Sequence, residues 1–309
     1  MIEIIHPGLH SIIVDAGRFG FGDMGVPSSS AMDGLAYKAV CYLTDNPQDS
    51  PVIESIGPMF SIKFHRPMVF AITGAHVEGL LDGRPFTSWQ SIRAKEGSIL
   101  NIKKIKEGFR YYMGFSGVMD IERAMGSFTT NMECHFGGYN GMPLRKGDVI
   151  NFQAIHDVIE RSIDKDMIPD MNSPHVLCVV DGPEIDFFKD DSIESFFKED
   201  YTVSTKSNRT GIRLTGNPMK FKEGAEKSII SEGILPGTIQ IPGDGMPIIM
   251  LYERTVGGYA RLCKVIRADL DRLAHLKPGD QLTFKRVSID EALELWRKKQ
   301  EIIKNILKT

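Results

Sequence analysis

The chain has 309 residues, which is enough for two domains with separate hydrophobic cores. Its formal net charge of −3 at pH 7 gives no electrostatic basis for binding nucleic acid or an anionic membrane. The N-terminus lacks the pattern of a signal peptide, and no apolar run is long enough to cross a bilayer. We therefore expect a cytoplasmic protein without nucleic-acid or membrane partners.

Cysteine and histidine spacing points to no metal chemistry. The four cysteines, Cys41, Cys134, Cys178 and Cys263, lie far apart and beside apolar segments, which predicts buried, reduced thiols. The histidines form no H-E-x-x-H motif and no paired spacing with the cysteines. We expect no protein-bound metal.

Alternating apolar residues predict that the first half is mostly strands. These are expected at Gly8–Val14, Met59–His65, Met68–Thr73, Ser88–Arg93 and Phe109–Phe115. One helix interrupts the series. Ser30 suits its N-cap, Asp33 its third position, and an apolar stripe continues to Leu43 before Asn46-Pro47 ends it.

Asp157–Ser173 is charged, contains proline and has little periodicity, so it is the best candidate linker. It predicts two domains, residues 1–165 and residues 166–309. The second domain is expected to begin with a strand at His175–Val180 and short helices within Ile185–Asp200. It is expected to close with a helix from Ser288, where Glu291 completes a capping box.

One phrase recurs three times, as AKEGSILNI (94–102), LRKGDVINF (144–152) and LKPGDQLTF (276–284). In each, a turn containing glycine leads into an alternating strand. The repetition indicates two related β-units, or else only a common hairpin turn, and both interpretations stay open. The pattern as a whole predicts a mainly β protein of two barrel-like units with a few helices.

The segment 231–270 is the richest in chemistry. Two apolar strands, Gly237–Ile241 and Pro247–Leu251, flank a turn, and the pair Gly257-Gly258 permits close approach of a ligand to the backbone. Polar residues occupy the strand ends and turns, where a rigid sheet presents them to a ligand: Gln240, Asp244, Glu253, Arg254, Tyr259 and Arg261. The alternative is an ordinary hairpin with solvated charges.

Four motifs are dispersed over nearly the whole chain. They are Asp15, Gly17-Arg18 and Gly20 with Gly25-Val26-Pro27, Ser29 and Ala31-Met32-Asp33; Gly126-Ser127, Thr130, Gly137-Gly138, Gly141, Leu144 and Gly147-Asp148; Ser207-Asn208-Arg209, Gly211, Arg213-Leu214 and Gly216; and Ser231-Glu232-Gly233, Pro236-Gly237, Ile239-Gln240, Pro242, Asp244-Gly245, Pro247-Ile248, Thr255 and Gly257-Gly258-Tyr259. In this order they resemble the family of the C-type subunit of 5-oxoprolinase, also described as allophanate hydrolase subunit 2 or the biotin-dependent carboxyltransferase family.

The resemblance implies a fold of two cyclophilin-like β-barrel domains with a few helices. It also implies a hydrolase subunit that opens the lactam of 5-oxoproline to L-glutamate at the expense of ATP. A homologous B-type subunit, with or without a third subunit, would complete the enzyme. No G-x-x-x-x-G-K-[ST] occurs in the chain, so ATP is expected to be bound by the complex rather than by a motif here.

Two other functions stay open. The chain would be a carboxyltransferase subunit acting on urea or an amide-type nitrogen, with biotin supplied on another protein because no A-M-K-M attachment motif occurs here. Alternatively it would be a regulatory binding module that counters a kinase inhibitor, as in a related pair of proteins.

The candidate catalytic residues are charged side chains on the motif-bearing loops: Asp15, Arg18, Asp33, Arg209 and Arg254. Arginine suits bidentate recognition of a carboxylate or an oxyanion, and an aspartate can act as a general base. The candidate substrate-binding residues are Gln240, Asp244, Gly257, Gly258, Tyr259 and Arg261. Structural roles compete with these assignments: Asp15 with Arg18 as a buried ion pair, and Asp33 as a residue that favours a helix start.

The chain departs from the family pattern at five positions that bear on specificity. Ser30 and Gly243 stand where the pattern has Gly and Pro, Met246 and Arg254 replace Gln, and Ala260 replaces Pro. The departures leave open whether the substrate is that of the best-known members.

Overall fold

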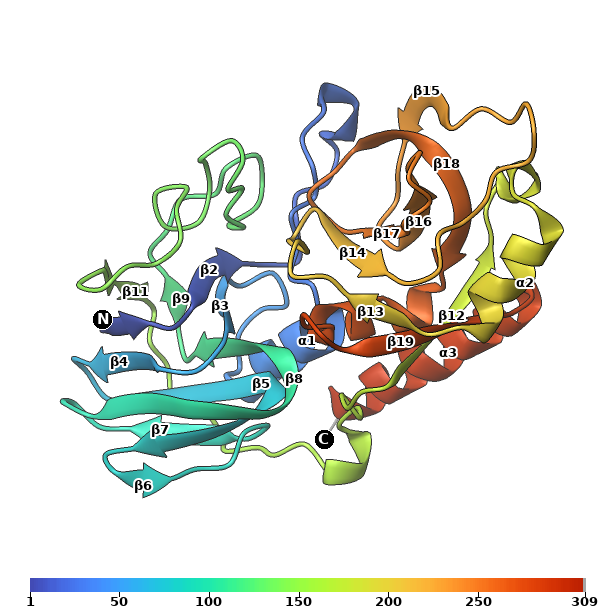
Figure 1. The fold of residues 1–309 in the computed structure, drawn as a ribbon. Coiled ribbons are helices and arrows are strands. Elements are labelled where there is room, and N and C mark those ends of the chain that lie inside the picture. The colour runs from blue at the N-terminus through green and yellow to red at the C-terminus, as the bar shows by residue number, and fades with distance from the viewer. Residues whose placement is uncertain (308–309) are drawn as a thin grey trace. The chain divides into compact units, whose positions relative to one another are not determined.

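The structure, a computed structural model, describes residues 1–307. Within them the chain divides into two compact units (Figure 1). The first consists of Met1–Phe19, Ser29–Asp170 and the residues from Ile302 onward, and the second of Gly20–Ser28 and Met171–Glu301. That residues 1–165 and 166–309 are two independently folding domains stays a prediction.

A branched antiparallel sheet forms the first unit. Its strands run in the spatial order β10-β1-β4-β8-β3-β2, and β5 pairs with β8 while β6 and β7 pair with β5. The bounds are β1 (Ile2–Pro7), β2 (His10–Val14), β3 (Val52–Ile56), β4 (Phe60–Phe64), β5 (Met68–Leu81), β6 (Arg84–Pro85), β7 (Ser91–Ala94), β8 (Ile99–Phe115) and β10 (Val149–Ile150). A separate pair joins β9 (Val118–Met119) to β11 (Phe152–Gln153).

Strands β5 and β8 extend beyond the predicted segments Met68–Thr73 and Phe109–Phe115, because their pairing continues past several bulges. Pairing runs from Phe70 opposite Phe115 to Leu81 opposite Leu100, with shifts between Gly74 and Gly79. Gly74 has φ +77°, and a Cβ there would lie 2.6 Å from the Arg110 carbonyl oxygen. Only glycine therefore allows the bend at this point.

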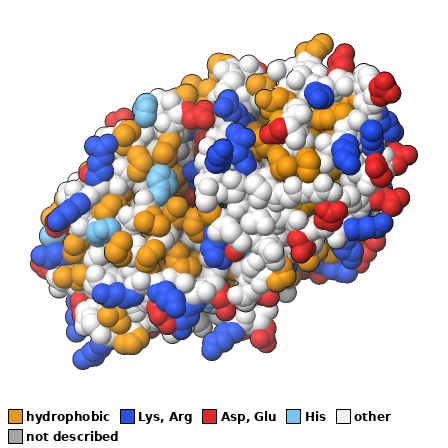
Figure 2. Space-filling model, in the orientation of Figure 1, with side chains coloured by type: hydrophobic (Ala, Val, Ile, Leu, Met, Phe, Trp, Pro, Cys, Tyr) orange, Lys and Arg blue, Asp and Glu red, His pale blue; other side chains and the backbone are white. Residues whose placement is uncertain are grey.

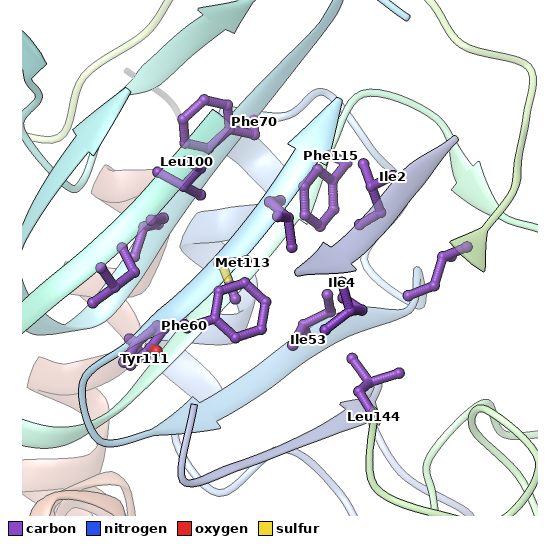
Figure 3. Close-up of a cluster of buried hydrophobic side chains, with 14 of the residues drawn as sticks. Ile2, Ile4, Ile53, Phe60, Phe70, Leu100, Tyr111, Met113, Phe115 and Leu144 are labelled. Atoms are coloured by element: carbon purple, nitrogen blue, oxygen red, sulfur yellow. The ribbon is translucent and has the colours of Figure 1, made fainter. Parts of the chain in front are cut away.

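The core of the first unit is a continuous apolar cluster between the strands (Figure 3). Ile2, Ile4, Phe60, Phe70 and Phe115, labelled there, are each at most 1% exposed. They come from strands far apart in the sequence, so the sheet is stabilised mainly by burial of these side chains.

Helix α1 (Gly34–Leu43) packs on the first sheet, but it begins later than predicted. Asp33, not Ser30, is the N-cap, with extended backbone (φ −107°, ψ 100°) and a side chain that accepts a hydrogen bond from the Ala36 amide. The prediction of Ser30 is wrong because any small hydroxyl residue before an apolar stripe satisfies the pattern, whereas backbone geometry selects the cap. The helix ends at Leu43, with Thr44 as its C-cap, before Asn46-Pro47 as expected.

A closed barrel forms the second unit. The strands run in the order β12-β19-β13-β14-β17-β16-β18, and β18 pairs back with β12 to close the ring, with β15 added on the far side of β18. The bounds are β12 (His175–Asp181), β13 (Tyr201–Val203), β14 (Gly211–Thr215), β15 (Ser228–Gly233), β16 (Thr238–Ile241), β17 (Ile248–Met250), β18 (Val256–Val265) and β19 (Gln281–Arg286). All pairs are antiparallel except β12 with β19.

Helical segments accompany the strands of each unit. The 3₁₀ helices are η1 (Gly22–Met24), η2 (Lys165–Met167), η3 (Ile185–Phe187) and η4 (Arg267–His275), and the other α-helices are α2 (Asp190–Lys198) and α3 (Ile289–Ile306). The prediction of short helices within 185–200 is confirmed, and Phe196 of α2 stacks on Phe284 with ring centroids 4.5 Å apart. The capping box of α3 is confirmed as well: the Ser288 amide donates to Glu291 and the Glu291 amide donates to Ser288.

The recurring phrase has one local structure. Gly97, Gly147 and Gly279 all have positive φ, and a strand follows each of them: β8, β10 and β19. Asp148 accepts a hydrogen bond from the Arg145 amide at 2.7 Å, and Asp280 accepts one from the Lys277 amide at 3.0 Å. The same turn therefore begins a strand in both units.

Cysteine burial differs from the prediction at one position. Cys41 and Cys263 are buried and Cys178 is partly buried, but Cys134 is exposed on the loop after β9. In the part of the chain that the structure describes, no helix has both the length and the apolar character needed to cross a membrane. Charged side chains of both signs are interspersed over the face shown in Figure 2, in keeping with the small net charge.

Candidate functional site

Asp15, at the end of β2, anchors a distant loop. Its side chain is buried, and its two carboxylate oxygens accept four hydrogen bonds: from the Gly17 amide at 2.9 Å, the Ser127 hydroxyl at 2.6 Å, the Phe128 amide at 2.6 Å and the Thr129 hydroxyl at 2.7 Å. These hydrogen bonds join the first family motif to the loop that carries the second.

Arg18 contacts the same loop through its guanidinium. Its Nε donates to the Ala124 carbonyl at 3.0 Å and its Nη2 to the Thr129 carbonyl at 2.9 Å, while its guanidinium lies 4.5 Å from the centre of the Phe136 ring. A Cβ on Gly137 would overlap the Thr129 carbonyl. The glycine is therefore required for this close packing.

Asp33 caps α1 within a buried polar cluster of the first unit. Its amide donates to the Tyr112 hydroxyl at 2.9 Å. Burial raises the pKa of Tyr112 well above its usual value, and the Glu54 and Asp33 carboxylates raise it further. The phenol therefore stays protonated and hydrogen-bonded at neutral pH.

Glu54 and Arg110 complete this cluster, and the sequence reasoning missed both. Glu54 is 3% exposed, lies 3.5 Å from the Arg110 Nε and accepts a hydrogen bond from the Met32 amide. The available signal was a charged residue inside the apolar run of β3, since a buried charge needs a partner.

In the second unit the structure brings five of the six predicted substrate-binding residues together on β16 and β18, all but Asp244. Gln240 is opposite Arg261 in the register, and its amide nitrogen donates to the Tyr259 carbonyl at 3.2 Å. The Gln240 side chain lies against Gly257, where a Cβ would be 2.9 Å from its amide carbon. The absence of a side chain at 257 therefore makes room for the glutamine.

Arg261 is clamped by two carboxylates. Its Nε and Nη2 donate to Glu184 at 2.8 and 2.6 Å, its amide donates to Glu184 at 2.9 Å, and its Nη2 also lies 2.9 Å from Glu232. The hydrogen bonds from Arg261 lower the pKa of Glu184, and those to Glu184 raise the pKa of Arg261. Because two carboxylates neutralise it, Arg261 is poorly suited to attract an anion.

Arg209 pairs with a buried glutamate in a different part of the second unit. Its Nε lies 3.3 Å from Glu253, and the Arg209 and Glu253 side chains are 13% and 9% exposed. Sequence reasoning placed Glu253 at a strand end but did not assign it to Arg209.

Two other predicted residues of the second unit are exposed. Arg254 lies on the same loop as Glu253, and Asp244 lies at the β16–β17 turn, where its side chain accepts a hydrogen bond from the Met246 amide at 3.0 Å.

The predicted residues thus fall into separate groups. Asp15, Arg18 and Asp33 belong to the first unit, whereas Arg209, Arg254 and the six substrate-binding residues belong to the second. A cavity of about 460 Å³ in the second unit is lined by residues outside the predicted set: Val180, Asp181, Arg286, Val287, Ser288, Ile289 and Glu291. The catalytic and substrate-binding roles stay predictions.

Residues 24–286 match the family model described as the carboxyltransferase domain, subdomain A and B. The chain belongs to this carboxyltransferase domain family. The matched range contains all predicted site residues except Asp15 and Arg18, and the family resemblance inferred from the four motifs is confirmed.

Two relatives of this chain match over nearly their whole length. The chain is 30% identical over 308 residues to the C-type subunit of 5-oxoprolinase from Escherichia coli, covering 99% of this chain and 97% of the relative. It is 32% identical over 301 residues to the C-type subunit of 5-oxoprolinase from Haemophilus influenzae, covering 97% and 96%. These relatives are named as parts of an enzyme, so the chain is similar to enzyme subunits.

Among solved structures, K. lactis urea amidolyase matches 99% of this chain with a TM-score of 0.92 and 28% identity. The chain spans only 20% of that much longer protein. The predicted fold class, mainly β with a few helices, is confirmed, with a closed barrel in the second unit and a branched sheet in the first.

Proposed function

We propose that this chain is a subunit of an ATP-dependent 5-oxoprolinase. Together with a homologous B-type subunit, and with or without a third subunit, it opens the lactam of 5-oxoproline to L-glutamate in the cytoplasm. One observation carries the proposal: the match covers 97% and 96% of two proteins named as the C-type subunit of 5-oxoprolinase, but only 20% of the urea amidolyase chain. This coverage of both relatives supports the first assembly.

The chemistry needs groups that recognise a small cyclic amide bearing a carboxylate. Arg254 is exposed and stands three residues before Gly257, so its guanidinium suits the carboxylate of 5-oxoproline. Gln240 lies buried beside the glycine pair with its amide nitrogen on the Tyr259 carbonyl, so its amide oxygen is the part suited to accept from the lactam N–H. Arg209 with Glu253, and Asp15 or Asp244, are the candidates for charge stabilisation and proton transfer.

ATP is assigned to the assembled complex rather than to this chain. The only helix that the structure describes in the glycine-rich stretch 17–25 is η1, which has three residues, so the stretch lacks the helix N-terminus that binds phosphate in the usual nucleotide sites. The residues present therefore do not fit a nucleotide cradle of that kind.

The test is 5-oxoproline-dependent ADP release by this chain mixed with its partner subunits. We expect Arg254→Ala to lower kcat/KM at least about 10-fold, the effect of losing a charge-assisted hydrogen bond to substrate. Arg213→Ala removes another exposed arginine of the same unit and serves as the matched control. A fully active Arg254→Ala enzyme would remove Arg254 from the site.

The carboxyltransferase is the second candidate, favoured by the family description and by the fold shared with urea amidolyase. A complete mixture that releases no ADP with 5-oxoproline, together with capture of this chain on avidin through a biotinylated protein, would support it. Tight binding to a partner with no turnover by any combination would instead indicate the regulatory module.

A further inference from the structure

Strand β15 is attached to the barrel of the second unit rather than built into it. It pairs with β18 alone and is the last strand in the spatial order, along the outer side of the curved β18 in Figure 1. Its residues are exposed apart from the half-buried Ile229, and Ile230 is 88% exposed. Little apolar burial therefore holds this strand in place.

The ladder between β15 and β18 is interrupted. Ser228 is opposite Tyr259, and Glu232 and Gly233 are opposite Gly257 and Val256, but the register is irregular between Ser228 and Glu232. The middle of β15 is thus tied to the barrel less regularly than its ends.

This irregular middle lies against Gly258, the second glycine of the pair. A Cβ on Gly258 would lie 3.1 Å from the Ser231 hydroxyl oxygen and 3.4 Å from the Ile229 carbonyl oxygen, so β15 passes directly over that residue. The neighbouring Gly257 has Gln240 against it. A ligand reaches the backbone at Gly258 from this side only when β15 moves away.

One ion pair fastens β15 over the glycines. Arg261 of β18 is fixed by Glu184 through Nε, Nη2 and its own amide, and its Nη2 also lies 2.9 Å from Glu232 of β15. Glu184 is buried, whereas the Glu232 side chain is 57% exposed. The ion pair between Arg261 and Glu184 is therefore shielded from solvent, whereas solvent and salt weaken the ion pair between Arg261 and Glu232.

We propose that β15 is a strap that opens and closes over Gly257–Gly258, and that Arg261, held by Glu184, is the latch that keeps it closed through Glu232. In this assignment Arg261 is a positioning residue and does not bind the substrate. Only the identity of the ligand, 5-oxoproline, rests on the proposed function. The opening of the strap does not.

Hydrogen–deuterium exchange on the full chain tests the strap directly. Glu232→Gln is expected to speed exchange in peptides covering 228–233 roughly two- to five-fold, the effect of losing a partly exposed ion pair. Glu226→Gln is the control. It removes an exposed carboxylate from the segment before β15, and among the described residues Glu226 shows no ion pair to Arg261. Its exchange is expected to match that of the wild type. Added salt should speed exchange in the wild type but not in Glu232→Gln.

Equal exchange of 228–233 in the wild type and Glu232→Gln at low salt would overturn the strap. In the assembled enzyme Glu232→Gln should also change KM for 5-oxoproline at least about two-fold, the size expected for one partly exposed ion pair, with Glu226→Gln unchanged. If the exchange result holds but the wild-type assembly does not turn over 5-oxoproline, the strap stands and the proposed function fails.

Discussion

Asp15 shows how a buried carboxylate is satisfied by its surroundings. Both oxygens are occupied by donors from Gly17 and from residues 127–129. A general base must offer a lone pair to a substrate or to water. The geometry therefore favours the structural role of Asp15 that the sequence left as an alternative.

Removing this carboxylate should destabilise the fold. Asp15→Ala leaves several buried donors without an acceptor, and we expect it to lower the free energy of unfolding by about 3 kcal/mol. Urea denaturation measures this, with Asp157→Ala as the control, because the Asp157 side chain is fully exposed. A change below about 0.5 kcal/mol together with loss of activity would return Asp15 to the catalytic set.

Helix α1 shows the same competition between roles at the scale of an element. Asp33 satisfies the Ala36 amide at the first turn, and the Tyr112 hydroxyl accepts from the Asp33 amide. Asp33 therefore belongs to a family motif, caps helix α1 and lies in a buried polar cluster. A cap role requires an acceptor oxygen, whereas a catalytic role requires the carboxylate itself.

Two substitutions at Asp33 separate these roles. We expect Asp33→Ala to cost about 1–2 kcal/mol of stability, whereas Asp33→Ser keeps a capping oxygen and should cost less than about 0.5 kcal/mol. Thermal unfolding of both variants measures the difference. If Asp33→Ser is stable but inactive in the assembled enzyme, Asp33 contributes more than a cap.

Across the whole molecule, buried titratable groups couple stability to pH. His175 is 6% exposed, and its burial lowers its pKa although Asp280 opposes the shift, with Lys277 and Arg272 adding to it. The unfolded chain therefore takes up this proton at a higher pH than the folded chain. The stability due to neutral His175 is complete above the unfolded pKa of about 6.5 and is lost as the pH falls through the folded pKa.

The free energy of unfolding should therefore decrease as the pH falls through about 6.5, where the unfolded histidine takes up its proton. His175→Gln should flatten this dependence, whatever its effect on absolute stability, and His6→Gln, at an exposed histidine, should leave it unchanged. Glu184, whose pKa is lowered by Arg261, contributes in a separate window, losing its stabilisation only as the pH falls below its unfolded pKa of about 4.3. A wild-type slope retained in His175→Gln would contradict the assignment.

Features that depend on neighbouring residues could be predicted from the amino-acid sequence. Strand alternation, the capping box of Ser288 and Glu291, the glycine turns and the family motifs are all encoded within a few positions. Local periodicity and hydrogen bonding therefore suffice to predict them.

Only the tertiary structure showed which distant side chains contact one another. The pairing of β18 with β12 that closes the barrel, the Arg110 partner of Glu54 and the Glu184 partner of Arg261 each join residues more than 50 positions apart. Such pairs depend on the path of the whole chain and on which charges burial forces together, and no local pattern specifies either. For that reason the fold and family followed from the sequence, whereas the roles of Asp15, Asp33 and Arg261 had to be reconsidered from the folded chain.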